Sequence, residues 1–263
     1  YQTNYTYPLN KETSKYNNLI TPKLSLKLSL PSSKDVRKKD RIIGYENIYD
    51  LDRLGIAETS EGGISATYGY EFTKIHKSNF DEKMKFGFAN NLRFEENKDL
   101  PINSNLGDKT SDFVGLFEYK HNENLKFNYD FSLKNNLDDK NYELFGFEYY
   151  LNKFSTKFEY LNKNNSNLKT SYLKNETKFN FDEKNSLIFE TSENKEKSFT
   201  EFYNIIYQYE NDCLKAGIEY NKEYYSDEDL KPSENLFFKI TILPFGGFNT
   251  PNLKWLHLKD QPF

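Results

Sequence analysis

The chain has 263 residues, of which 36% are hydrophobic and 17% are aromatic, with 21 Tyr and 23 Phe against one Trp. Disordered chains are depleted in aromatic residues, so this composition predicts a fold that shelters them. A formal net charge of -4 argues against a polycation that binds nucleic acid. No apolar run reaches the about 18 residues of a membrane-spanning helix, and residues 1–10 lack the apolar core of a signal peptide. Because the chain begins with Tyr1, we expect a mature or truncated product.

Strand-like segments follow one another along almost the whole chain. In residues 125–134, Leu125, Phe127 and Phe131 alternate with polar residues such as Lys126 and Asp130, which is the period of two of a strand with one apolar and one polar face. The same alternation recurs in 154–160 and 173–181. In chain order the sequence predicts thirteen strands near 1–8, 19–30, 63–76, 80–94, 111–121, 124–134, 141–151, 153–162, 169–181, 185–194, 198–209, 213–224 and 235–243.

The connections between these strands alternate in length. Short turns at Lys77-Ser78, 121–123, 152–153, 182–184 and 210–212 alternate with links of varying length, the longest at 95–110 and 226–234. One edge of the sheet therefore carries tight turns and the other carries loops. That asymmetry is typical of a bacterial outer-membrane β-barrel, whose strands turn apolar side chains to lipid and polar side chains to the lumen.

The predicted fold is therefore an all-β, antiparallel transmembrane β-barrel in the outer-membrane lipid bilayer. Bacterial barrels of this kind have an even number of strands, whereas thirteen is odd. We therefore predict that residues 1–245 are the C-terminal portion of a larger barrel of about 26 strands, and that residues 246–263 are a periplasmic tail. The alternation assigns six candidate cations to the lumen, for each of which an ordinary solvated residue is the favoured interpretation: Lys126, Lys134, Lys157, Lys174, Lys178 and Lys215.

The single cysteine, Cys213, follows the short turn 210–212. A lone Cys is most often a small buried hydrophobic residue, whereas in an extracytoplasmic chain it suggests a partner elsewhere. Its spacing from Lys215 and Glu219 predicts that it faces the lumen at the short-turn end, while Leu214 and Ile218 face lipid.

Three segments carry recognisable motifs. Residues 43–70 contain Asn47, Tyr49 and Arg53, then Glu61-Gly62-Gly63 and a strand with Tyr68-Gly69-Tyr70. A second segment runs from Pro101 to Gly107 and on to Ser111-Asp112-Phe113, and a third, 207–232, contains YENDC and YYSDEDLKP before the strand LFFKITIL. Together they resemble the C-terminal barrel domain of the lipopolysaccharide-assembly outer-membrane proteins, the LptD or organic-solvent-tolerance family. Residues 51–55 read LDRLG where that family reads LNRFSG.

The resemblance implies a function and a set of partners. It implies a translocon in the bacterial cell outer membrane that receives lipopolysaccharide from periplasmic bridge proteins, is plugged by an LptE-like lipoprotein, and releases its cargo through a lateral seam. It also implies that Cys213 forms a disulfide with an N-terminal periplasmic domain. The strand 235–243 would form one lip of the seam, where Pro232 and Pro244 either weaken pairing or only delimit the strand. Its outward residues are Leu236, Phe238, Ile240 and Ile242.

Several other functions stay open on sequence grounds. We expect no enzyme, cofactor or metal centre, because the three histidines are far apart and neither an H-E-x-x-H nor a G-x-S-x-G motif is present. A barrel phospholipase would need a Ser and a His brought together by the fold. The main alternative is a passive porin or autotransporter barrel, and a soluble β-rich adhesin built from two stacked sheets is a further one.

Overall fold

The computed structural model describes residues 1–30, 34–164, 169–224, 232–242 and 246–248, and it is all-β. Its single sheet is antiparallel, and neighbouring strands follow the chain order from β1 to β15, with β2 pairing beside β1 on β3. The strands are β1 (Gln2–Thr6), β2 (Leu9–Glu12), β3 (Tyr16–Ser29), β4 (Gly63–His76), β5 (Glu82–Arg93), β6 (Phe113–Asn122), β7 (Leu125–Leu133), β8 (Lys140–Leu151), β9 (Phe154–Asn164), β10 (Lys169–Asn180), β11 (Asn185–Asn194), β12 (Phe199–Glu210), β13 (Leu214–Glu223), β14 (Ser233–Ile242) and β15 (Gly246–Phe248).

Among the described residues, no strand pairing joins β1 or β2 to β14 or β15. All the described strands belong to this one sheet. The helical content described is one 3-10 turn, Ile102–Ser104. No helix in the described ranges is both long and apolar enough to span a membrane.

The number of strands differs from the predicted thirteen at the two ends of the chain. The segment predicted as one strand over 1–8 continues as a second piece, β2, beyond Pro8. Proline has no backbone N–H to donate to the ladder, which explains the interruption. At the other end, residues 246–248 were assigned to the tail but pair with β14 through Ile240, Thr241 and Ile242. Residues 249–263 of the predicted tail lie outside the described residues.

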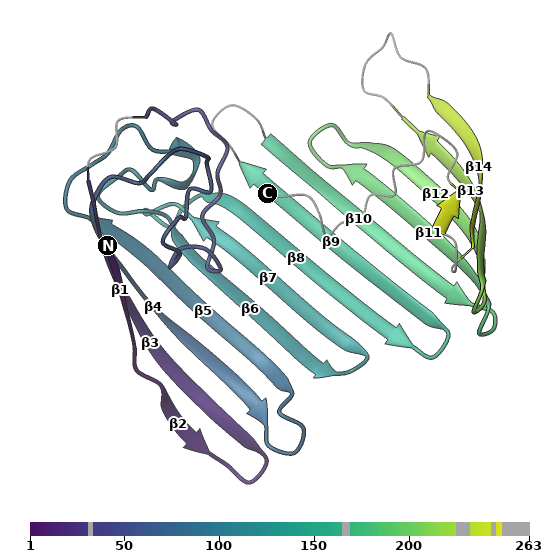
Figure 1. Cartoon of the computed structure of the whole chain (residues 1–263), viewed down its shortest axis with the longest axis horizontal. Helices are drawn as coiled ribbons and strands as arrows, with labels where there is room; N and C mark the ends of the chain where they lie inside the picture. The colour runs from purple at the N-terminus through teal and green to yellow at the C-terminus, as the bar shows by residue number, and fades with distance from the viewer. Residues whose placement is uncertain (31–33, 165–168, 225–231, 243–245, 249–263) are drawn as a thin grey trace. The chain divides into compact units, whose positions relative to one another are not determined.

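The chain divides into two compact units, and the first comprises Tyr1–Phe145 and Leu161–Thr170. β3 and β4 pair without a break from Tyr16 opposite His76 to Ser29 opposite Gly63. The turns β4–β5 and β6–β7 are short and lie at one end of these strands, whereas the long connections β3–β4 and β5–β6 gather at the other end (Figure 1).

The long connections of the first unit fold back onto one face of its sheet, called here the covered face. Residues 34–62, the first loop, and 94–112, the second loop, pack their apolar side chains against Ala89 of β5 and Val114 and Leu116 of β6. The apolar side chains contributed by the loops are Ile43, Tyr45, Ile48, Leu54, Leu100 and Leu106. The opposite face is uncovered, and Leu24, Leu26 and Leu28 there are 39%, 46% and 53% exposed.

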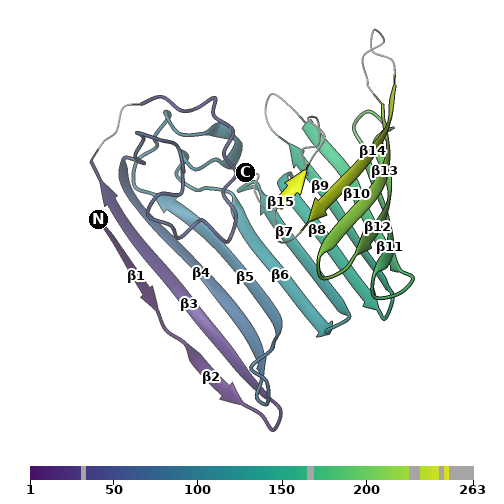
Figure 2. The same ribbon diagram turned by 45° about the vertical axis from the view of Figure 1, so that its right-hand side comes forward.

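The second unit comprises Gly146–Tyr160 and Ser171–Phe263. Its strands β11 to β14 lie side by side (Figure 2) and keep the alternation of period two. One face of these strands carries Glu190, Asn204 and Asn221. The opposite face carries exposed apolar side chains, which are Leu187, Phe189, Ile205, Tyr207, Ile218, Leu236, Phe238, Ile240 and Ile242.

Candidate functional site

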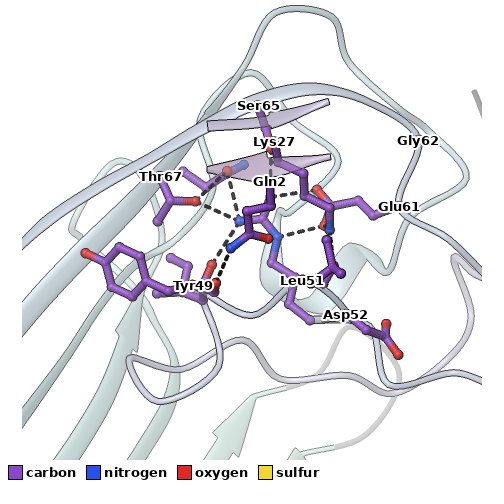
Figure 3. A network of polar contacts seen from close by, with 12 residues as sticks. Gln2, Lys27, Tyr49, Leu51, Asp52, Glu61, Gly62, Ser65 and Thr67 are labelled. Atoms are coloured by element: carbon purple, nitrogen blue, oxygen red, sulfur yellow. Dashed lines mark hydrogen bonds and ion pairs between the residues drawn. The ribbon is translucent and has the colours of Figure 1, made fainter. Parts of the chain in front are cut away.

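A buried polar network fastens the first loop to the covered face (Figure 3). At its centre Arg53, only 1% exposed, donates from Nε and Nη2 to the two carboxylate oxygens of Glu61 at 2.7 and 2.8 Å. This two-point contact is the strongest geometry that an arginine and a carboxylate form. The guanidinium also donates to Ser65 Oγ at 2.8 Å and Thr67 Oγ1 at 2.9 Å, both on β4.

Two further cations converge on the same carboxylate. Lys27 of β3 donates to Glu61 Oε2 at 3.0 Å and to the carbonyl of Leu51 at 2.6 Å. Arg93 of β5 donates to Glu61 Oε1 at 2.5 Å and to the carbonyl of Gly62. Two strands, β3 and β5, therefore contact Glu61 directly, and β4 contacts its loop partner Arg53 through Ser65 and Thr67, which fixes the first loop over the ends of these three strands.

The electrostatics of Glu61 follow from these partners. Burial acts to raise the pKa of Glu61, but Arg53, Lys27 and Arg93 outweigh it and lower the pKa to about 2. Glu61 is therefore ionised at all ordinary pH values. Removing the Glu61 carboxylate would leave three cations in a poorly solvated space without a counter-charge. The loss of one partner of a buried ion pair strongly destabilises a fold.

Asp112 plays the corresponding part for the second loop. This carboxylate is 1% exposed and accepts hydrogen bonds from Asn105 at 2.6 Å, Ser132 at 2.9 Å and Asn141 at 2.6 Å. Burial raises the pKa of Asp112 even though the three hydrogen bonds act to lower it. These contacts tie the second loop to β7 and β8. Each of the two loops is therefore held to the sheet by one buried carboxylate.

Two tyrosines of the first loop approach the sheet where it carries glycine. A Cβ on Gly69 would lie 2.2 Å from the Tyr49 hydroxyl, and a Cβ on Gly87 would lie 2.4 Å from the Tyr45 ring. Only glycine leaves room for these rings. Burial raises the pKa of both Tyr45 and Tyr49, so their hydroxyls stay neutral.

Beside these tyrosines lies a cavity of about 280 Å³. The covered face contributes Lys23 and Glu71, which form an ion pair at 2.7 Å, and Lys85, which contacts Glu46 of the first loop at 3.4 Å. Tyr45 donates to Glu71 at 3.0 Å, and the Lys23 ammonium lies 5.4 Å from the centre of its ring. The remaining lining comes from Asn4, Tyr5, Thr6, Leu24 and Tyr49.

The motif residues predicted between 47 and 63 are brought together by the fold. Arg53, Glu61 and Gly62 belong to the buried network, and the Tyr49 carbonyl accepts from Gln2 at 2.6 Å. Asn47 shapes the turn by accepting from the Gly44 N–H at 3.0 Å. Gly63 has φ 97°, a conformation that favours glycine.

The six predicted lumen lysines differ in their surroundings. Lys134 lies beyond the end of β7 and pairs with Asp139 at 3.0 Å, so it belongs to a loop rather than to the sheet wall. Lys215 pairs with Glu210 at 3.1 Å, and Lys174 lies 4.4 Å from the centre of the Tyr172 ring. Lys126, Lys157 and Lys178 alternate with the apolar residues of their strands, as the sequence predicted.

Cys213 lies in the short turn between β12 and β13, exposed and with a free thiol. Its strand was predicted to begin at residue 213 but begins at Leu214. The Cys213 N–H donates to the Asn211 side chain at 3.0 Å, which closes the turn and keeps Cys213 out of the ladder.

The strand predicted as the lip of a seam is β14, with Leu236, Phe238, Ile240 and Ile242 on its exposed face. It is not the last strand of the sheet, because Ile240–Ile242 pair with β15 on the side away from β13. Pro232 directly precedes β14, and Pro244 lies outside the described residues.

Sequence reasoning missed most of the partners of Arg53 and Glu61. Lys27, Ser65 and Arg93 come from three strands, and no local pattern links them to the loop. Strand parity offered one signal, because Ser65 lies opposite both Lys27 and Arg93 in the ladder and so shares their face. In the described part of the chain no group of three or more His, Cys, Asp or Glu side chains is placed to hold a metal ion.

No protein-family model matches this chain, and no curated protein is significantly similar to it in sequence.

Proposed function

We propose that this chain is part of a lipopolysaccharide-assembly barrel in the bacterial outer membrane, through which lipopolysaccharide passes to the outer leaflet. The supporting observation is the exposed apolar face that each unit carries opposite a polar one. In a water-soluble sheet such a face would be buried against another layer. In a membrane, hydrocarbon covers it, and the alternation of period two is what a lipid-facing wall requires.

The limit of the apolar face in the second unit supports a membrane location. Toward the loop end of β12 and β13, the ring of Tyr203 lies 6.2 Å from that of Tyr220 and 6.1 Å from that of Tyr224. On the same face Lys222 pairs with Glu234 at 2.5 Å. Aromatic residues followed by charged ones are typical of the boundary between hydrocarbon and headgroups.

The assignment to lipopolysaccharide assembly rests on the motif resemblance together with the fold of the first loop. Of the residues that carry the resemblance, Arg53 and Glu61 hold this loop against the sheet, and Gly69 leaves room for Tyr49. Under this proposal the periplasmic bridge proteins deliver the cargo, an LptE-like lipoprotein occupies the barrel, and Cys213 pairs with a cysteine outside this chain.

Photo-crosslinking in the living cell tests the cargo. A photoreactive amino acid at Asn128, on the polar face of β7, should yield adducts that an antibody against lipopolysaccharide detects. The same amino acid at Phe127, one residue along on the apolar face, should yield phospholipid adducts instead. Absence of lipopolysaccharide from the Asn128 adducts, in a protein that sediments with the outer membrane, would exclude transport and favour the passive porin.

A lateral exit is a separate part of the proposal. A disulfide that joins β14 to the strand which completes the barrel should stop the appearance of lipopolysaccharide at the cell surface, and a reductant should restore it. Unchanged export with the strands locked together would refute the lateral exit.

A further inference from the structure

The cavity beside the first loop lies at the β1 edge of the sheet, where Tyr5 and Leu24 of the uncovered face join the lining, and it has the chemistry of a sugar site. Its walls combine tyrosine rings with hydrogen-bonding side chains of both kinds, donors and acceptors. Sugar rings offer hydroxyl groups at their edges and apolar C–H groups on their faces, so they match such a lining. The volume of about 280 Å³ is close to the lower end of the range for small-molecule sites.

The charges of the lining decide what kind of ligand fits. Two lysines and two glutamates face the cavity, and they form two ion pairs, Lys23 with Glu71 and Lys85 with Glu46. The lining therefore has no excess of either sign. An anion would have to displace a carboxylate from its lysine, and a cation would have to displace a lysine. A neutral ligand that hydrogen-bonds to groups already in place has no such cost.

The uncharged groups lie where a ligand would reach them. Asn4 and Thr6 of β1 are exposed, and their pairing with Ser25 and Lys23 places them on the covered face beside the ion pair. Glu71 already accepts from Lys23 and Tyr45 through Oε2. A bound hydroxyl group would add a further donor to this carboxylate.

We propose that this cavity binds one neutral sugar unit. The inference rests on the proposed function for the source of the sugar, which would be the saccharide part of the transported glycolipid. The binding step itself depends only on the residues of the cavity, so it is measured without transport.

Saturation-transfer difference NMR on the full 263-residue chain tests the proposal. The chain is held in lauryldimethylamine oxide, because detergents with sugar headgroups would compete. Glucose, galactose and N-acetylglucosamine are offered separately at millimolar concentration, and inorganic phosphate is offered as a competitor. We expect transfer to at least one sugar and no loss of signal with phosphate.

Paired variants locate the site. Glu71→Gln should weaken sugar binding about tenfold, and Asn4→Ala about fivefold, as expected for lost hydrogen bonds to a charged and a neutral group. Glu118→Gln and Asn128→Ala, on the same face but outside the cavity, should leave binding unchanged. Asn4→Ala keeps the contacts of Lys23 and Tyr45 but removes the hydrogen bond that Asn4 accepts from Gln2, whose side chain also donates to the Tyr49 carbonyl. Unchanged proteolysis within residues 34–62 shows that this variant leaves the first loop in place.

Three results would overturn the inference. They are no transfer to any sugar by a chain with its full β circular-dichroism signal, equal effects of cavity and control variants, and displacement of the sugar by phosphate. If lipopolysaccharide crosslinks to Asn128 but no sugar binds, the sugar site is wrong and the proposed function stands. Sugar binding by a chain that never crosslinks to lipopolysaccharide supports the site and contradicts the function.

Discussion

At the scale of the residue, Glu61 contributes strongly to the stability of the fold although it lies in a loop. Lys27, Arg53 and Arg93 all pair with its carboxylate. Glu61→Gln should lower the free energy of unfolding by about 3–5 kcal/mol, because it leaves buried cations without a counter-charge. The measurement is urea unfolding in detergent micelles.

Glu58→Gln is the matched control for this prediction. Its side chain is 90% exposed and lies 3.8 Å from Lys34, a surface contact that contributes little. If the Glu61 and Glu58 variants unfold at the same urea concentration, the network does not hold the loop.

The same carboxylate makes stability depend on pH. The pKa of Glu61 is about 2 in the folded chain against an ordinary value of 4.5. A lowered carboxyl pKa stabilises the fold above the unfolded value, and this stabilisation is lost as the pH falls through the folded value. The difference in unfolding free energy between wild type and Glu61→Gln should therefore be constant above about pH 4.5 and shrink toward pH 2. A difference that stays constant down to pH 2 would show that Glu61 is not held ionised by its partners.

Gly87 should tolerate no side chain. In Gly87→Val the new Cβ would lie 2.4 Å from the Tyr45 ring, so the first loop must move. We expect a loss of about 1–3 kcal/mol and faster proteolysis within residues 34–62. Gly217→Ala is the control, because its nearest neighbour would be 3.4 Å away. Protease resistance of the Gly87 variant equal to wild type would contradict this packing.

At the scale of the element, each strand should respond to charge on one face only. Ile218 is 43% exposed on the apolar face of β13, and Glu219 follows it on the other face. In a membrane, Ile218→Arg should cost about 2–4 kcal/mol, whereas Glu219→Gln should be nearly neutral. Folding into lipid vesicles from urea measures both. A nearly neutral Ile218→Arg would mean that water already covers this face.

The elements themselves were largely predictable from the sequence. Every predicted strand has a counterpart, because alternation such as that of Phe127 and Phe131 with Lys126 and Asp130 is a local property of the chain. The predicted strand 1–8 ends at Pro8, where β1 and β2 are separated, and only the four-residue strand β2 beyond it was not predicted. The short strand β15 had no such signal, since three residues carry no period.

The candidate site was predictable only in part. Arg53, Glu61 and Asp112 were found because they lie in short motifs. Their partners were not, since Lys27 is 34 residues from Glu61 and Asn141 is 29 residues from Asp112. Contacts of this kind depend on strand register and on how a loop folds back onto the sheet, and a short stretch of sequence predicts neither.

At the scale of the whole molecule, a membrane location requires every sheet edge to be paired, because hydrocarbon offers no partner to a backbone N–H or C=O. Among the described residues, β1 and β2 have one neighbouring strand each, and Leu236–Lys239 of β14 have a partner only on the side of β13. The proposed function therefore requires that these edges be paired in the membrane.

Accessibility along β14 tests the central claim most directly. With Cys213 replaced by Ser, single cysteines at residues 236–242 are spin-labelled in lipid vesicles and exposed in turn to oxygen and to a water-soluble nickel complex. The account predicts that spin labels at residues 236, 238, 240 and 242 are more accessible to oxygen, which dissolves in the hydrocarbon. Labels at 237, 239 and 241 should be more accessible to the nickel complex, which stays in water. Equal access of nickel to all seven positions would contradict it.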